Sequence, residues 1–354
     1  MTLAKEGFGR TLRRGRAAAY ERTPVNWAPT IPGVLMAMIP GELLALAVFP
    51  EWRASQASWL LLGITLPFAA WLLVYWRIYL SVFVTSSLNP ADPIDPRWKP
   101  FTFMGWGDET LKAYLLESDE ESGDLLLFLH GYNSCISRGE TRPLHIHSMG
   151  VNVITLDQRG FGNQRGRIDW TLLKVLADIE GLLEEAPSAL GFMPQRLWIY
   201  GHSMGGFLTI RLASHLSGWW GEALQGIVLE SPAASFPKII DSKLPGRMVM
   251  AKPWVRHVLR REHERIHPDL NVRYANSELP YWGIPEVPAL VVQSEHDEIL
   301  GGDHFALIQE HMPENTEIHV LDIPHTSTAE TDERRSTVEA WMESQLGYNR
   351  NVSE

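Results

Sequence analysis

The stretch LWIYGHSMGG, residues 197–206, constrains the fold of this 354-residue chain more than any other segment. An apolar run ends abruptly at Gly201, Ser203 follows, and Gly205 completes a G-x-S-x-G pattern. This pattern is typical of a sharp turn from a strand into a helix, in which the apical serine adopts a strained backbone conformation. Glycines beside the serine leave room for the turn. The sequence therefore predicts a strand, a tight turn and a helix, with the hydroxyl of Ser203 exposed at the apex.

A second predicted strand ends in a loop that is expected to lie beside this turn. An apolar run at residues 124–129 is followed by His130, Gly131 and Tyr132. The glycine lets the backbone approach a substrate, and a helix that begins behind Ser203 directs the amide of Met204 to the same place. The backbone amides of Tyr132 and Met204 are therefore the predicted oxyanion hole. His130 is expected to be a structural, hydrogen-bonding residue of this loop.

Two loops near the C-terminus offer a base and an acid for the serine. One apolar strand runs into QSEHDEIL, which contains Asp297, and a later strand leads through a proline to His325. Functional residues lie at the carboxyl ends of strands in open α/β sheets. A serine hydroxyl needs a general base, and the imidazole needs a carboxylate that fixes its tautomer. We therefore predict a triad of Ser203, His325 and Asp297, with Glu295 as an alternative acid.

The order of these motifs points to a family. HGY at 130, DQRGFG at 157, GHSMGG at 201, the Asp297 loop and the Pro-His pair at 325 follow one another as in α/β-hydrolases. Over about residues 100–347 the chain resembles that superfamily, and within it the serine esterases and lipases similar to monoacylglycerol lipases and lysophospholipases. The resemblance implies a mostly parallel sheet with helices on both faces, a cap at about residues 233–283, and catalysis by the triad without a cofactor or a metal.

Two apolar stretches precede this region. Residues 30–49 and 57–76 are each long enough to cross the hydrocarbon core of a bilayer as helices. The second has no charge and carries Trp and Tyr toward its ends, whereas the first contains Glu42, which is costly inside a bilayer. We expect a transmembrane hairpin, with a single span as the alternative.

The placement of charge predicts how such an anchor is oriented. Six basic residues precede the first stretch, and further basic residues follow the second. Because cytoplasmic flanks carry the excess of Lys and Arg, a hairpin places the hydrolase domain in the cytoplasm, as expected for an inner membrane of bacterial type. A single span places that domain on the outer side.

The chain then divides into four parts. They are a basic tail at 1–29, a membrane anchor at 30–84, a proline-rich linker at 85–100 and an α/β-hydrolase domain at 101–347.

The cap differs in charge from the chain as a whole, whose net charge is −11. Between residues 234 and 273 it has nine Lys or Arg against four Asp or Glu. This excess can attract an anionic substrate or hold the cap against anionic lipid, and a solvated amphipathic surface explains it equally well. The cap also contains His263-Glu264-Arg265-Ile266-His267, which matches the H-E-x-x-H zinc pattern. The segment is charged almost all round, which favours a surface helix over a zinc site.

Together these features predict a membrane-anchored serine hydrolase of carboxylic esters. A lipid-derived ester is favoured because the anchor holds the site near a bilayer. A thioesterase or a serine peptidase uses the same groups, and a zinc hydrolase is an alternative of another class. A non-catalytic scaffold is disfavoured because every triad position is filled. The expected partners are the lipid bilayer and a small acyl ester, with no nucleic acid and no obligate protein partner.

Overall fold

A mixed eight-stranded sheet forms the centre of the molecule. The structure, a computed structural model, describes residues 43–44, 46–51, 55–83, 94–119, 122–164, 170–243, 252–266, 274–326 and 331–347. The strands are β1 (Lys99–Met104), β2 (Thr110–Leu116), β3 (Asp124–Leu129), β4 (Asn152–Leu156), β5 (Arg196–His202), β6 (Leu224–Glu230), β7 (Ala289–Ser294) and β8 (Glu317–Leu321). They lie in the order β1-β2-β4-β3-β5-β6-β7-β8. β1 and β2 are antiparallel to their neighbours, and the strands from β4 to β8 across the sheet are parallel.

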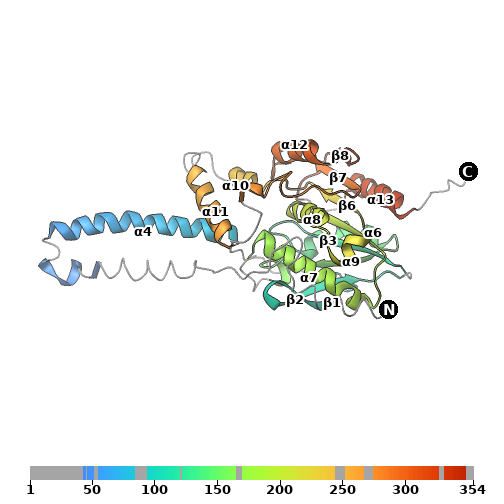
Figure 1. Ribbon diagram of the computed structural model, residues 1–354, viewed down its shortest axis with the longest axis horizontal. Helices are drawn as coiled ribbons and strands as arrows, with labels where there is room; N and C mark the ends of the chain where they lie inside the picture. The colour runs from blue at the N-terminus through green and yellow to red at the C-terminus, as the bar shows by residue number, and fades with distance from the viewer. Residues whose placement is uncertain are drawn as a thin grey trace, which may run out of the picture.

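Helices cover both faces of this sheet, which explains why its central strands are apolar throughout. One face packs against α7 (Leu172–Leu190), α8 (Met204–Ser214), α9 (Gly218–Ala223) and α12 (Gly302–His311), and the other against α5 (Ile136–Gly139), α6 (Thr141–His147) and α13 (Asp332–Leu346). Figure 1 shows α7 and α8 in front of the strands, with α6 and α13 on the other side. The predicted α/β-hydrolase fold is therefore confirmed.

The long helix α7 shows how local sequence sets the bounds of these elements. It begins after Thr171, whose hydroxyl oxygen accepts a hydrogen bond from the N–H of Lys174 at 3.2 Å. It ends at Gly191, where φ is 78°, a left-handed conformation that glycine adopts without strain.

A cap lies between β6 and β7, where the sequence predicts one. It contains α10 (Phe236–Lys243), α11 (Lys252–Ile266) and the short 3-10 helix η4 (Tyr274–Asn276). Figure 1 shows α10 and α11 beside one end of the sheet. The alternative zinc site lies outside the part of the chain that the structure describes, which does not include the side chains of His263 and Glu264 or any of His267.

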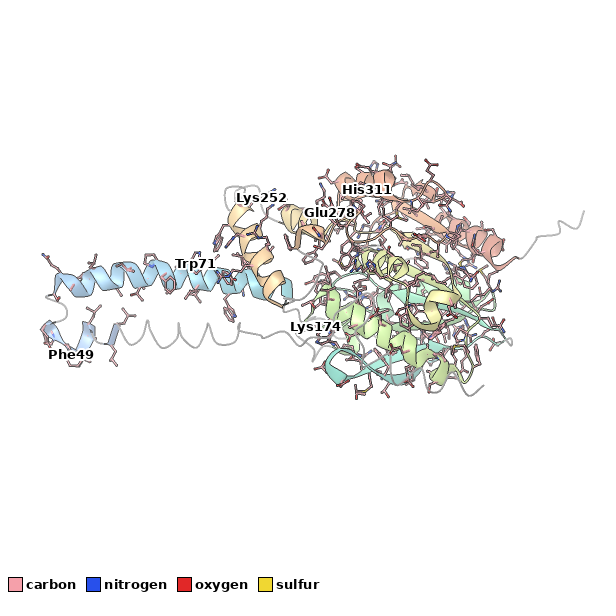
Figure 2. All side chains as sticks on the ribbon, viewed as in Figure 1. Phe49, Trp71, Lys174, Lys252, Glu278 and His311 are labelled. Carbon is pink, nitrogen blue, oxygen red and sulfur yellow. The ribbon has the colours of Figure 1, made fainter. Side chains whose placement is uncertain are left out.

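The apolar stretch predicted at 57–76 is the helix α4 (Gln56–Phe83), which continues beyond the expected end. Its C-terminal part packs on the hydrolase domain through Trp76 and Ile78 and contacts α11, so tertiary contacts extend the helix. Its other end projects away from the domain, and Figure 2 shows side chains, Trp71 among them, standing out along this arm. Across the described residues, no helix is both long and apolar enough to traverse a membrane.

Residues 30–42, most of the first predicted span, lie outside the described residues, as does the basic tail. The start of the hydrolase domain also differs from its predicted position at residue 101. β1 begins at Lys99, and Trp98 before it is buried and donates its indole N–H to Glu140 at 3.2 Å. The end of the predicted proline-rich linker is therefore part of the domain, because an aromatic residue there finds a site in the core.

Candidate active site

The predicted tight turn between a strand and a helix is present. β5 ends at His202, α8 begins at Met204, and Ser203 between them has φ 55° and ψ −115°. This positive φ is rare for a residue with a side chain, so the turn is strained. The apex is held by a hydrogen bond from the N–H of Ser203 to the carbonyl oxygen of Glu230 at 2.9 Å.

The two glycines of the motif make the turn sterically possible. A Cβ at Gly205 would lie 2.1 Å from the carbonyl oxygen of Leu129, and a Cβ at Gly201 would lie 2.5 Å from the carbonyl oxygen of Gly205. Neither contact is tolerated. The glycines therefore let α8 pack directly against the end of β3, which brings Ser203 beside the loop at His130.

The structure brings the three predicted triad residues into one hydrogen-bonded chain. His325 lies in the loop after β8, with Nε2 2.9 Å from Oγ of Ser203 and Nδ1 2.8 Å from Oδ2 of Asp297. A carboxylate only accepts, so Nδ1 carries the proton and Nε2 accepts from the serine hydroxyl. The alternative acid, Glu295, is exposed, and its carboxylate makes no hydrogen bond with His325 in the described structure.

Asp297 is held as a carboxylate. Burial raises its pKa, but the hydrogen bond from His325 and two backbone N–H groups outweigh this effect and bring the pKa below its ordinary value. Those N–H groups belong to Ile299 and Leu300, at 3.0 and 2.9 Å from Oδ1. The loop after β7 therefore fixes the charge and the orientation of the carboxylate that faces His325.

The loop predicted to form the oxyanion hole lies against the serine. A Cβ at Gly131 would lie 3.2 Å from Cβ of Ser203, so the backbone before Tyr132 closely approaches the apex. Met204 is the first residue of α8, and the first N–H groups of a helix have no acceptor within it. The backbone amides of Tyr132 and Met204 thus come from two elements that meet at Ser203.

His130 stabilises this loop from beneath. Its Nε2 accepts from the N–H of Gln158 at 3.0 Å and its Nδ1 donates to the carbonyl oxygen of Gly131 at 2.8 Å. Burial lowers the pKa of His130, which favours the neutral ring that both contacts require.

His202 is a site residue for which no role was predicted from the sequence. Its Nε2 donates to the backbone carbonyl oxygen of His325 at 2.8 Å, and the two rings lie 5.3 Å apart. Burial, and then the nearby Arg142, lower the pKa of His202 to about 3. A neutral ring therefore connects the serine turn to the loop that carries His325. Local sequence gave no sign of this contact because its partner lies 123 residues away.

A buried ion pair beneath the site was also not predicted from the sequence. Nε and Nη2 of Arg142 donate to the two carboxylate oxygens of Glu230 at 2.8 and 2.7 Å, and the hydroxyl of Tyr200 donates to Oε2 at 2.6 Å. Burial raises the pKa of Glu230, but Arg142 and other positive neighbours lower it far below its usual value. Because the carbonyl of Glu230 also holds the N–H of Ser203, this pair supports the strained turn.

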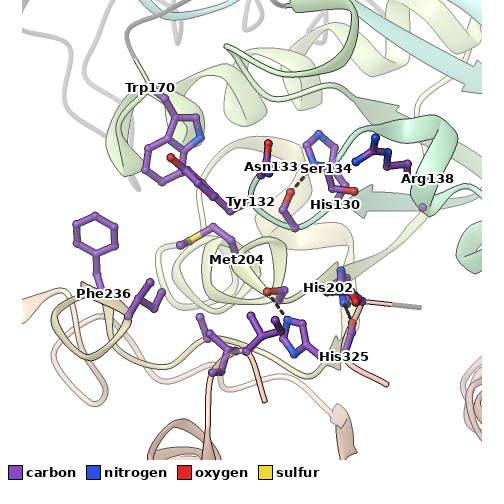
Figure 3. Close-up of a pocket in the computed structure, with 18 of the residues that line it drawn as sticks. His130, Tyr132, Asn133, Ser134, Arg138, Trp170, His202, Met204, Phe236 and His325 are labelled. Carbon is purple, nitrogen blue, oxygen red and sulfur yellow. Dashed lines mark hydrogen bonds between the residues drawn. The ribbon is translucent and has the colours of Figure 1, made fainter. Parts of the chain in front are cut away.

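A cavity of about 910 Å³ opens above Ser203. Its walls come from the loops after β3 and β8, from the cap helices α10 and α11, and from α4. The apolar lining includes Val74, Ile78, Phe236, Ile239, Trp254 and Leu259, and the basic side chains that reach it are Arg138 and Arg142. Among the described residues that line the cavity there is no Asp or Glu. Met204 and His325, on either side of Ser203 in the lining, are labelled in Figure 3, with Met204 near the middle of the view and His325 below it.

Comparisons with known proteins agree with this fold. Residues 120–304, more than half of the chain, match a family described as serine aminopeptidase, S33. An esterase from Pyrococcus furiosus is similar in structure over 74% of this chain and 98% of its own, with 18% identity and a TM-score of 0.54. An α/β-hydrolase from Vibrio vulnificus is similar over 71% of this chain and 82% of its own, with 20% identity and a TM-score of 0.51. No curated protein matches the chain significantly. The family match shows that the chain belongs to the serine aminopeptidase S33 family of α/β-hydrolases and is a serine hydrolase.

Proposed function

We propose that this serine hydrolase cleaves carboxylic esters with lipid-derived acyl chains, such as a monoacylglycerol or a lysophospholipid. One observation carries the proposal. The hydrogen-bonded chain from Ser203 through His325 to Asp297 ends in a cavity whose walls are apolar on the side of α4, α10 and α11. An apolar cavity of about this size suits an acyl chain better than a polar group.

In the proposed reaction the ester is cleaved in two steps. Oγ of Ser203 attacks the carbonyl carbon while its proton passes to Nε2 of His325, and Asp297 stabilises the resulting imidazolium. The amides of Tyr132 and Met204 bind the negative oxygen of the tetrahedral intermediate. When the intermediate collapses, the bond to the alcohol oxygen breaks, and that oxygen takes the proton from His325. Water then attacks the acyl-enzyme in the same way and releases the fatty acid.

The charge of the cavity favours an ester over the N-terminus of a peptide. An aminopeptidase has to bind a free ammonium group, for which a buried site needs a carboxylate partner. The charged side chains of the described lining are Arg138 and Arg142, both positive. A substrate with an ammonium group at this position would be repelled.

The exposed side of α4 supports attachment to a lipid bilayer. Residues 56–76 have no charged side chain, and the large apolar side chains along them are mostly exposed. These are Trp59, Leu60, Ile64, Leu66, Phe68, Trp71, Leu73 and Val74. A contiguous exposed apolar surface marks a contact with lipid or protein, and aromatic rings near its ends suit the interface of a membrane. We assign this surface to lipid and, from the basic residues of the N-terminal tail, place the hydrolase domain on the cytoplasmic side of an inner membrane.

A substrate panel tests the activity. The full chain in detergent is assayed with p-nitrophenyl esters of increasing chain length, an acyl thioester, and p-nitroanilides of free amino acids. We expect ester hydrolysis to rise with chain length, with little action on the anilides, and to disappear in Ser203→Ala. Hydrolysis of the anilides in preference to the esters would contradict the proposal.

A flotation assay tests whether the protein binds to a membrane through α4. The chain is mixed with phosphatidylcholine vesicles and separated on a density gradient, with the triple variant Leu60→Ser, Ile64→Ser, Phe68→Ser compared with the wild type. We expect the wild type to float and the variant to float less. Equal flotation of both would refute the role of α4, and digestion of the domain by protease added outside intact spheroplasts would refute its cytoplasmic location.

A further inference from the structure

The cavity above Ser203 has two chemically different ends. One end is apolar and is built by α4, α10 and α11 through side chains such as Ile78, Phe236 and Trp254. The other end is polar and is built by the loop and short helix after β3, with Asn133, Ser134 and Arg138. In Figure 3, Phe236 and Arg138 lie on opposite sides of the view, with Met204 and His325 between them. A substrate that spans the site therefore has the reacting ester between an apolar part and a polar part.

Arg138 is the charged group of the polar end that has no partner. It is half-buried, lies on α5, and its guanidinium makes no hydrogen bond or ion pair in the described structure. The other basic residue of the cavity, Arg142, is neutralised by two hydrogen bonds to Glu230. No carboxylate from the described lining reaches the cavity to offset Arg138. The polar end thus has one uncompensated positive charge.

These observations fix which part of the ester faces Arg138. In an acyl-enzyme the acyl chain stays bound to Ser203, so it requires the apolar end, and the alcohol leaves by the polar end. The guanidinium of arginine is a planar fork of donors that matches the oxygens of a phosphate. An alcohol that carries an anionic group near the ester oxygen would place that group within reach of Arg138.

We propose that Arg138 recognises an anionic phosphate on the alcohol part of the substrate and thereby selects phosphate-bearing esters over neutral ones. This inference rests on the proposed ester hydrolysis at Ser203. The bond that breaks is the one between the acyl carbon and the glycerol oxygen, and the proton on His325 passes to that oxygen. The phosphate is not cleaved. Arg138 touches the substrate away from the reacting atoms and determines specificity.

A matched pair of substrates tests the role of Arg138. 1-Hexanoylglycerol and 1-hexanoylglycerol 3-phosphate have the same ester and the same short chain, so both stay monomeric in solution. The measured quantity is the ratio of kcat/KM for the phosphate to kcat/KM for the neutral ester. A charge-assisted hydrogen bond changes binding by about 10- to 100-fold. We expect the wild type to favour the phosphate by about this factor, and hexanoylglycerophosphocholine shows whether a phosphate diester is accepted as well.

Three variants complete the experiment. Arg138→Gln should reduce the ratio by about 10- to 100-fold, and Arg138→Lys should restore part of it because a point charge remains. Arg260→Gln is the control: Arg260 is exposed on α11 and outside the described lining, so the same loss of charge should leave the ratio unchanged.

An equal fall of the ratio in Arg138→Gln and Arg260→Gln, or no fall in Arg138→Gln, would overturn this inference while ester hydrolysis still stands. If the wild type cleaves neither ester, the proposed function fails and the inference fails with it. Melting curves of each variant establish that it is folded.

Discussion

Replacing His202 by glutamine should make the protein less sensitive to acid. His202 donates from Nε2 to the carbonyl oxygen of His325, and it is neutral in the folded state because burial and Arg142 lower its pKa to about 3. The side-chain amide nitrogen of glutamine lies about as far from the backbone as Nε2 of histidine, so it can donate to the same oxygen, but glutamine does not titrate. The substitution His202→Gln therefore keeps the hydrogen bond and removes the proton-binding group.

The size of the effect follows from the two pKa values of the histidine. In the unfolded chain an ordinary histidine titrates near pH 6.5, whereas His202 in the folded protein titrates at about 3. Between these values the unfolded state binds more protons, so stability is lost as the pH falls. From pH 7 to pH 5 the full shift corresponds to about 2 kcal/mol. Because the ring lines the cavity and keeps some contact with solvent, we expect about 1 kcal/mol.

Thermal unfolding at pH 7 and at pH 5 measures this effect. For a domain of this size, 1 kcal/mol changes Tm by about 2–4 °C. The fall in Tm between the two pH values should be smaller in His202→Gln than in the wild type by this amount. As a control, His202→Phe removes the donor and should lower Tm at both pH values, since the carbonyl of His325 loses its partner. An identical pH dependence in wild type and His202→Gln would refute the reasoning.

Three further predictions concern the supports of the serine. Asp297→Asn should lower kcat by about 10³- to 10⁴-fold with little change in KM or Tm, because the tautomer of His325 is no longer fixed. A loss of kcat under tenfold in steady-state kinetics would contradict this. Gly205→Ala should destabilise the protein by at least about 2 kcal/mol in urea unfolding, since its Cβ would lie 2.1 Å from the carbonyl oxygen of Leu129, and a neutral effect would refute that packing. Arg142→Met should cost about 3–5 kcal/mol, because the buried Glu230 would lose two charge-assisted hydrogen bonds and keep the more distant Arg334, at 3.5 Å, as its ion-pair partner. An unchanged urea midpoint would contradict the role of the Arg142–Glu230 pair.

The arrangement around Ser203 was predictable because it depends on chain order and strand ends. In a parallel sheet the carboxyl ends of the strands share one edge, so loops after β3, β5, β7 and β8 had to meet. Asp297 and His325 follow such strands, and the structure places both in the chain of hydrogen bonds to Ser203. The mostly parallel sheet was implied by the resemblance to α/β-hydrolases, and the pairing of the strands from β4 to β8 agrees with it.

The supports of the site were not predictable, because they join residues that are distant in sequence. Arg142 and Glu230 are 88 residues apart, and nothing near either one indicates its partner. The same holds for His202. α4 lines part of the cavity because it packs against α11. The periodicity of apolar residues in the sequence does not determine how these two helices pack. The proposed role of Arg138 was not predictable either, because it depends on the lack of a carboxylate in the described lining of the cavity, which is known only from the structure.

Labelling by a fluorophosphonate probe, followed by mass spectrometry of the labelled peptide, tests the central claim most directly. The claim is that Ser203 is a nucleophile activated by His325 and Asp297. We predict that folded wild type is labelled on Ser203, that Ser203→Ala is not labelled, and that His325→Ala is labelled far more slowly. If folded wild type is not labelled, or is labelled at a residue other than Ser203, the claim is contradicted.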